Sequence, residues 1–403
     1  MRTSIELFAG AGGLALGIYA AGFDHLALVE FNRHACATLR QNALCLGVSR
    51  DLERIVEGDV RELDYSSFGR AVDLLAAGAP CQPFSLGGKH RGDEDGRNMF
   101  PQVFRAMREL RPKAVLLENV RGLKRQSFRP YFDYILRQLE TPHLTPRPGE
   151  TWWDHNERLS RARDREAIVD PETTYTVAEK LLNSAAFGVP QRRHRVILVA
   201  FRNDLGISWT HPAGNHSEER LLFEQYVTGE YWDRHSLPRR PSPAELAERV
   251  ATLRLVPPGG EAWRTLRDAL AGLPEPVVGR EDPAFQFHTG IPGARVYPGH
   301  TGNPFDRPAK TIKAGDHGNP GGEHILLRDD GSIRYFTVRE SARVQSFPDC
   351  YRFTGSRTEA MRQIGNAVPV RMGQAIAQSV HDALGRVAST GDVARELAGG
   401  RAG

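Results

Sequence analysis

Short apolar runs alternate with helical patterns over the first 200 residues. The runs "SIELF", "HLALVE", "ERIVEGD", "VDLLAA" and "KAVLLEN" have the length of buried strands, and "RVILVAFR" at 195–202 is a later run of the same kind. Between them, "LALGIYAAG" and "MFPQVFRAMREL" place apolar residues at helical spacing. This alternation predicts an α/β fold built on a mostly parallel sheet with helices on both faces.

The pattern changes twice further along the chain. Proline and charged residues dominate 141–174, which we interpret as an insertion that carries one amphipathic helix near 152–165, most simply a solvated surface helix. Residues 203–336 are rich in Pro, Gly and His, which predicts a second lobe of short strands and loops. A helical pattern returns after residue 360 in "MRQIGNAVPVRMGQAIAQSVHDAL".

These changes predict two domains. The first spans 1–202, interrupted by the insertion, and is completed by 360–385 from the far end of the chain. The second spans 203–359, and 386–403 is expected to form a flexible tail. A chain of 403 residues is long enough for a large core and a second lobe.

Composition excludes several classes of protein. No apolar run is long enough to cross a bilayer, and the start lacks a signal segment, so the chain is expected to stay where it is made. The four cysteines show neither C-x-x-C spacing nor a paired His cluster, which argues against a metal site or a disulfide framework and favours a reducing compartment. A net charge of +4 does not by itself indicate a nucleic-acid partner.

The stretch "IELFAGAGGLALG" places a strand, a Gly-rich turn and a helix in succession. Gly10, Gly12 and Gly13 allow the backbone to approach a ligand at a helix N-terminus, and the spacing satisfies a relaxed dinucleotide pattern. Phe8, at the end of the strand, can pack against an adenosine ring.

Two acids follow at the ends of later strands. Glu30 lies about twenty residues on, where a carboxylate can bind ribose hydroxyls, and Asp59 can accept a hydrogen bond from an adenine amine. These residues predict an adenosine-containing cofactor, with NAD and S-adenosylmethionine both open. A tight structural turn with incidental acids is the alternative.

"GAPCQPFS" holds Cys81 between Pro80 and Pro83 at the carboxyl end of a strand, where ligands bind in open α/β sheets. The prolines make the loop rigid where the thiol projects, and this position leaves a nucleophilic thiol and a structural one equally open. In "LLENV", Glu118 and Asn119 reach the same rim, although a lone acid there could also cap a helix.

"QRRHR" places Arg193 and Arg195 at alternating positions that lead into a strand. Alternation predicts that both side chains point to one face, suited to binding phosphate or carbonyl groups. Solvated charges on an exposed edge are the alternative.

In this combination the chain resembles the DNA (cytosine-5)-methyltransferase family. It carries, in the family's order, "FAGAGG", Glu30, "GD" at 58–59, "GAPCQPFS", "ENV", "QRRHR", "RESARVQSFP" at 339–348 and "QIGNAVP" at 363–369. The resemblance covers about 1–140, 175–202 and 337–380. It implies the Rossmann-like sheet of S-adenosylmethionine-dependent methyltransferases and makes the second domain a target-recognition domain. The motifs do not fix the insertion, for which a contact with DNA or another subunit is the alternative role.

The resemblance implies transfer of a methyl group from S-adenosylmethionine to C5 of cytosine, the activity EC 2.1.1.37. Cys81 would add to C6, a protonated Glu118 would donate to N3, and Arg195 would hold O2. Asn119 would support the loop, and Arg193 would brace Glu118 or a backbone phosphate. A carboxyl that donates at neutral pH needs a raised pKa, which burial against the base could supply.

The same resemblance implies the binding residues. The cofactor positions are Phe8, Gly10, Gly13, Glu30, Asp59 and Asn366. The target base must be flipped out of double-stranded DNA, with "SLGGKHRGDEDGRN" as a mobile lid. The expected DNA contacts are Ser85, for a phosphate, and Lys310, Lys313 and His317, for bases.

The family analogy also suggests a monomer in a bacterial cytoplasm, associated with the nucleoid and not with a membrane. There it would serve a restriction–modification system whose endonuclease acts on the same site without forming a stable complex. Three rivals remain at this point: a nicotinamide-dependent oxidoreductase, a tRNA methyltransferase of the same superfamily, and a DNA-binding relative without catalysis.

Overall fold

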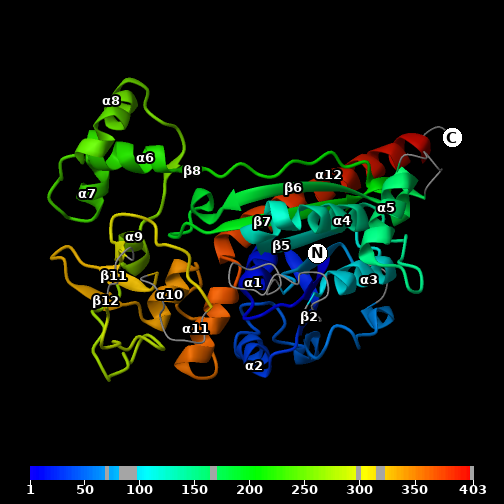
Figure 1. The fold of residues 1–403 in the computed structure, drawn as a ribbon, viewed down its shortest axis with the longest axis horizontal. Coiled ribbons are helices and arrows are strands. Elements are labelled where there is room, and N and C mark those ends of the chain that lie inside the picture. The colour runs from blue at the N-terminus through cyan, green and yellow to red at the C-terminus, as the bar shows by residue number, and fades with distance from the viewer. Residues whose placement is uncertain (69–71, 81–97, 164–169, 296–300, 315–322, 400–403) are drawn as a thin grey trace. The chain divides into compact units, whose positions relative to one another are not determined.

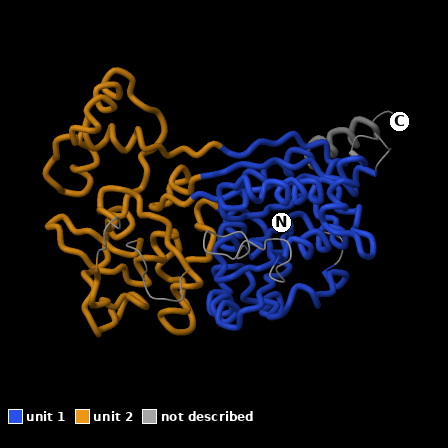
Figure 2. Tube along the Cα trace, in the orientation of Figure 1, with its two compact units in different colours: residues 1–182, 194–212, 373–403 blue, residues 183–193, 213–372 orange. Residues whose placement is uncertain are grey.

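The structure is a computed structural model that describes residues 1–68, 72–80, 98–163, 170–295, 301–314 and 323–399. The chain forms two compact units, drawn in different colours in Figure 2. Unit 1 comprises residues 1–182, 194–212 and 373–403, and unit 2 comprises residues 183–193 and 213–372.

Unit 1 is built on a seven-stranded sheet in the order β3-β2-β1-β4-β5-β7-β6 (Figure 1). The first five strands along the chain pair in parallel, and β7 is antiparallel to β5. The bounds are β1 Arg2–Leu7, β2 Phe23–Glu30, β3 Ile55–Glu57, β4 Leu74–Ala77, β5 Ala114–Val120, β6 Tyr175–Asn183 and β7 His194–Arg202. The predicted mostly parallel sheet is therefore confirmed.

The helices of unit 1 cover both faces of this sheet. Every residue of β4 and the last four of β1 are buried, which requires cover on both sides of the sheet centre. The side chain of Asn32 caps α2 by accepting hydrogen bonds from the backbone N–H groups of His34 and Ala35. The helices are α1 Gly13–Ala20, α2 Arg33–Gln41, α3 Phe100–Leu110, α4 Arg129–Glu140, α5 Trp152–Arg163 and α12 Val370–Gly399, of which residues 370–372 belong to unit 2.

Two segments of unit 1 differ from the sequence-based expectation. The insertion helix α5 is not merely solvated, because His155 is fully buried and its Nδ1 lies 3.0 Å from the hydroxyl of Tyr134 on α4. Trp152 of α5 also packs edge-on against Tyr131 of α4. At the other end, α12 continues to Gly399, although a flexible tail is expected from residue 386.

Unit 2 consists of short elements, as the Pro- and Gly-rich sequence predicts. Strands β10, β11 and β12 form one small sheet, and β8 pairs with β9 in another. The strands are β8 His216–Ser217, β9 Glu261–Ala262, β10 Asn303–Pro304, β11 Ile325–Leu327 and β12 Ile333–Tyr335. The helices are α6 Glu218–Phe223, α7 Glu230–Arg234, α8 Ala247–Leu255, α9 Leu266–Leu270, α10 Val338–Val344 and α11 Arg357–Asn366.

Buried polar side chains hold the core of unit 2 together. Gln345, fully buried, donates to the carbonyls of Ile364 and Ala367, and Gln191 donates to the side chain of Gln345. Arg339, also buried, donates to the carbonyl of Tyr351. The stretches 339–348 and 363–369 therefore act as the internal scaffold of this unit.

The compact units also divide the chain differently from the expected domains. Residues 183–193 and 360–372 cluster with unit 2, whereas 203–212 cluster with unit 1. The reason for the first difference is visible at Arg193, whose guanidinium donates to the carbonyls of Ile312 and Gly365 inside unit 2.

Gly365 offers a test of this packing. A Cβ there would lie less than 3.0 Å from the backbone of Lys313 and Ala314, whereas a Cβ at Gly259 would meet nothing within 4 Å. Because backbone cannot move aside like a side chain, Gly365→Ala should lower the free energy of unfolding by about 2 kcal/mol, despite the better helix propensity of Ala. Gly259→Ala should stay within about 0.5 kcal/mol of the parent. Urea denaturation followed by fluorescence measures both, and equal midpoints would contradict the packing.

Candidate active site

The glycine loop lies at the carboxyl end of β1, beside the point where the strand order reverses between β1 and β4. Gly10 and Gly12 have left-handed φ values of 54° and 80°, and Gly12 is the N-cap of α1. A Cβ at Gly10 would meet nothing within 4 Å, so the loop faces open space there. Phe8 has a φ of 58°, a strained conformation for a non-glycine residue.

Glu30 holds this loop to the next one. Its Oε2 accepts a hydrogen bond of 2.8 Å from the backbone N–H of Gly10, and its Oε1 accepts one of 2.7 Å from Asn32. One carboxylate at the end of β2 thus fixes two loops of the rim. Two of the positions expected to bind the cofactor, Gly10 and Glu30, are therefore in direct contact.

Glu6 is a feature that the sequence analysis missed. Its side chain is fully buried in β1, and its Oε2 has no hydrogen-bond partner among the described residues. Burial, with a smaller contribution from nearby Glu30, raises the pKa of Glu6 well above its ordinary value. The signal was present in the sequence as an acid inside the apolar run "SIELF".

Asp59 is held by a neighbouring arginine, whereas the ring of Phe31 is open to solvent. Arg61 donates from Nε to both oxygens of Asp59, and these hydrogen bonds are the main cause of a lowered pKa of Asp59. Phe31, next to Glu30, is 75% exposed. Sequence reasoning selected Asp59 but missed Arg61 and Phe31.

The cysteine loop follows β4. Cys81 and Ser85 lie outside the described residues, and the description of the loop ends at Pro80. Asn119 is buried and donates from Nδ2 to the carbonyl of Ala79 at 3.3 Å, which ties β5 to the backbone two residues before the cysteine. The Oδ1 of Asn119 accepts from the N–H of Val120.

Glu118 and Arg195 form an ion pair across β5 and β7. The Nε of Arg195 lies 2.6 Å from Oε1 of Glu118, and the two side chains are only 12% and 10% exposed. The contact is an ion pair and not a hydrogen bond, because the N–H of Arg195 does not point at Oε1. A Cβ at Gly78, which follows β4, would lie 3.9 Å from Oε2 of Glu118. The carboxyl group therefore reaches the base of the cysteine loop.

Arg193 does not behave as its spacing predicts. It is 2% exposed, and its guanidinium donates at 2.9 and 2.8 Å to the carbonyls of Ile312 and Gly365. Since β7 begins at His194, strand alternation does not govern this residue. The partner of Glu118 is Arg195, and the interpretation of Arg193 as its brace is replaced by an anchoring role within unit 2.

The other expected site residues lie in unit 2. Asn366 is exposed at the end of α11. Lys310 donates to Thr301 and Lys313 pairs with Glu323, so both ammonium groups already have acceptors. His317 lies outside the described residues. Within the ranges that the structure covers, no cluster of His, Cys, Asp and Glu could hold a metal ion, and no helix is long and apolar enough to span a membrane.

Comparison with known proteins places these features in a family. A family model described as C-5 cytosine-specific DNA methylase matches residues 2–142, 169–244 and 288–382. The chain is 33% identical over 393 residues to the type II methyltransferase M.Eco47II of Escherichia coli, which covers 96% of this chain and 80% of that protein. It is 31% identical over 386 residues to M.NgoMIV of Neisseria gonorrhoeae, covering 95% and 98% respectively.

A solved structure supports the fold. The Dnmt2 methyltransferase of S. pombe aligns with a TM-score of 0.56 over 95% of this chain and 99% of that one, at 16% sequence identity. At this identity the likeness concerns the fold.

The double contact of Glu30 can be tested through stability. In Glu30→Gln one acceptor oxygen becomes an NH₂ group that faces a backbone N–H, so the unfolding free energy should fall by about 1–3 kcal/mol. Glu53→Gln, an exposed change without such contacts, is the matched control and should have little effect. Thermal or urea unfolding compares the two, and an equal response would show that the carboxylate does not hold the loops.

Proposed function

The chain belongs to the C-5 cytosine-specific DNA methylase family and is a DNA (cytosine-5)-methyltransferase, and we propose that Cys81, Glu118 and Arg195 carry its chemistry. The observation that supports this assignment is the buried Glu118–Arg195 pair at the base of the cysteine loop. A carboxyl and a guanidinium in contact can address two neighbouring polar atoms of one pyrimidine ring.

C5 of cytosine is by itself a poor nucleophile toward a methyl donor. The enzyme must therefore activate the ring with a nucleophile of its own. The Cys81 thiolate adds to C6, which breaks the aromaticity of the ring and makes C5 enamine-like. Glu118, which must be protonated for this step, delivers its proton to N3 as the sulfur adds, and Arg195 neutralises charge at O2. After C5 takes the methyl group, water as a base removes the C5 proton, the C6–S bond breaks to release the thiolate, and N3 returns its proton to Glu118, which restores the neutral aromatic ring.

Asn119 and Arg193 are proposed as positioning residues. Asn119 holds the Ala79 carbonyl, so it sets where the chain enters the cysteine loop. Arg193 is anchored in unit 2 two residues before Arg195, and its two carbonyl contacts fix the chain immediately before β7. Neither residue needs to touch the base.

The proposed methyl donor is S-adenosylmethionine, which supplies an electrophilic methyl group on a sulfonium. Gly10 and Gly13 would let the backbone of the glycine loop approach the cofactor closely. Glu30 would bind the ribose, and Asp59 would accept a hydrogen bond from the adenine amine. The fit is supported by the open space at Gly10, where the backbone of the loop can approach a ligand.

Three further residues complete the proposed cofactor site. Phe8, strained at the end of β1, and Phe31, exposed beside Glu30, offer rings for the adenosine. Asn366 would close the site from the far end of the chain.

The proposed substrate is a short specific site in double-stranded DNA, from which the target cytosine is flipped. Ser85 would contact a phosphate, and Lys310, Lys313 and His317 would read bases. The two lysines would first have to leave Thr301 and Glu323. Relatives that are type II methyltransferases support a modification role in a restriction–modification system, with an endonuclease that acts separately on the same site. A monomer in a bacterial cytoplasm, near the nucleoid, fits that role.

Cys81→Ser tests the nucleophile. A hydroxyl is a far weaker nucleophile than a thiolate, so methylation should fall by about a thousandfold or more. Bisulfite sequencing of DNA from a host that expresses each protein measures it. The parent should also form a covalent adduct with DNA that contains 5-fluorocytosine when the methyl donor is present, and the variant should not. An adduct that maps to another residue would remove Cys81 from the mechanism.

Glu118→Gln tests the proton donor. Because an amide cannot deliver a proton to N3, kcat should fall by about 10²- to 10⁴-fold while cofactor binding is kept. The control is Glu179→Gln on β6, which removes the carboxylate of an exposed ion pair with Lys124 and should keep full activity. Steady-state methylation assays compare them, and similar kcat values would exclude Glu118 as the acid.

A further inference from the structure

Unit 2 contains a groove that no step of the methyl transfer uses. It consists of two adjoining cavities of about 370 and 250 Å³, which share Arg264 and Asp268 in their walls. Ser346 and Arg371 line the larger cavity, and Trp263 lines the smaller one. All of these residues belong to unit 2.

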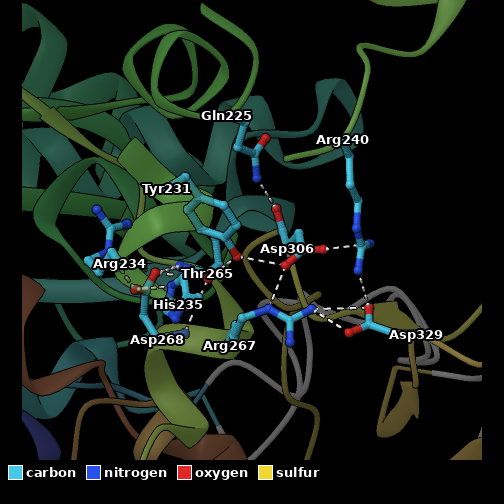
Figure 3. A network of polar contacts seen from close by, with 10 residues as sticks. All are labelled: Gln225, Tyr231, Arg234, His235, Arg240, Thr265, Arg267, Asp268, Asp306 and Asp329. Carbon is cyan, nitrogen blue, oxygen red and sulfur yellow. Dashed lines mark hydrogen bonds and ion pairs between the residues drawn. The ribbon is translucent and has the colours of Figure 1, made fainter. Parts of the chain in front are cut away.

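Most acids of the groove are already neutralised by partners. Asp268 accepts from the backbone and hydroxyl of Thr265 and lies 3.1 Å from Nε2 of His235 and 3.6 Å from Nε of Arg234 (Figure 3). Glu224 pairs with Arg220 and Arg234, and Asp349 pairs with Arg343. The exposed Glu261 lies 3.2 Å from Nε2 of His216, but burial lowers the pKa of that imidazole, so Glu261 keeps its negative charge.

Two guanidinium groups remain with few acceptors. Arg264 is exposed and makes no hydrogen bond or ion pair with any residue that the structure describes. Arg371 makes one long hydrogen bond, of 3.3 Å, to the carbonyl of Gly188. Burial and the nearby charge of Arg264 lower the pKa of Arg371, and the exposed Glu261 nearby raises it, so the two cations lie close together with a single carboxylate to offset their charges. Such a pair is satisfied by an anion between or beside them.

Uncharged donors point to the same chemistry. The buried Oγ of Ser346 has no hydrogen-bond partner among the described residues, and the same holds for Nε1 of Trp263. Ser346 also has a left-handed φ of 66°, which costs a non-glycine residue of order 1 kcal/mol or more. A strained serine with an unused hydroxyl in the wall of a cationic cavity is better explained by a ligand than by packing.

We propose that this groove binds a phosphodiester of the DNA backbone through Arg264, Arg371 and Ser346. Five arginines and four acids line the groove, so it offers N–H and O–H donors with an excess of positive charge, and a phosphodiester accepts from both kinds of donor. The inference rests on the proposed DNA substrate, and it adds a sequence-independent anchor to the base-reading residues expected around Lys310 and Lys313. Anchors of this kind set the register of a protein on the duplex.

Two variants separate binding from folding. Arg264→Gln removes one unpaired charge from an exposed position, and Arg254→Gln on α8, outside the groove, is the matched control. Ser346→Gly removes the hydroxyl and at the same time relieves the strained φ, so a purely structural Ser346 predicts unchanged or better stability and unchanged DNA affinity. A ligand role predicts weaker DNA binding in a protein that is no less stable.

Affinity is measured by titrating cognate and non-cognate duplexes at several salt concentrations, with methylation assayed on the same preparations. Arg264→Gln should weaken binding to both duplexes by a similar factor and reduce the slope of log K against log salt by about 0.9. Ser346→Gly should weaken both by about three- to tenfold, with the loss in KM for DNA and not in kcat. Arg254→Gln should bind like the parent.

The outcomes separate the possible failures. Equal affinity and salt slope for Arg264→Gln and Arg254→Gln would overturn the phosphate anchor while the parent still methylates DNA. A parent that methylates no DNA would instead remove the proposed function. Thermal shifts in phosphate and chloride at equal ionic strength identify the source of the anion. If Arg264→Gln loses a phosphate-dependent shift but keeps its DNA affinity, the groove binds free phosphate and the DNA assignment is wrong.

Discussion

The ion pair between Glu118 and Arg195 depends on one strand that runs against its neighbours. In the parallel part of the sheet, only carboxyl ends reach the rim that holds the glycine loop and the cysteine loop. Because β7 is antiparallel to β5, its first residues arrive at that same rim. The register sets Arg195 opposite Val120, so Arg195 and Glu118 are diagonal neighbours on one face. The reversal of a single strand therefore brings a cation to the edge where a carboxyl, an amide and the cysteine loop already converge.

Local signals predicted the parts of this arrangement that depend on local structure. The apolar runs predicted the strands, and the glycines predicted a turn that leaves backbone open to a ligand. The same rules were insufficient at Arg193, because alternation applies within a strand and β7 begins one residue later. They also passed over Glu6, since an acid in an apolar run is informative only once tertiary structure buries it without a partner.

The stretches 339–348 and 363–369 show a similar limit of sequence reasoning. As motifs they suggest chemistry, and in the structure their buried side chains mainly hold unit 2 together. Gln345 bridges to the end of α11, and Arg339 and Arg193 satisfy backbone carbonyls that burial would otherwise leave unpaired. This scaffold also shapes the groove, because Ser346 directly follows Gln345 and Arg371 lies on the helix that follows residues 363–369. A rigid frame of this kind lowers the entropy that ordering the donors would cost on binding.

The distribution of charge explains why net charge says so little about this protein. Unit 1 places the carboxylate of Glu30 against the loop proposed for a cationic methyl donor, and unit 2 leaves Arg264 and Arg371 with few acceptors in a groove suited to a polyanion. A total of +4, the balance of 53 basic and 49 acidic residues, shows neither of these local arrangements. Each proposed site also contains a non-glycine residue with a left-handed φ, Phe8 in one and Ser346 in the other. Glycine would relieve the strain at either position but would remove the ring or the hydroxyl that a ligand can use. The residues present are therefore those that favour binding at some expense of stability.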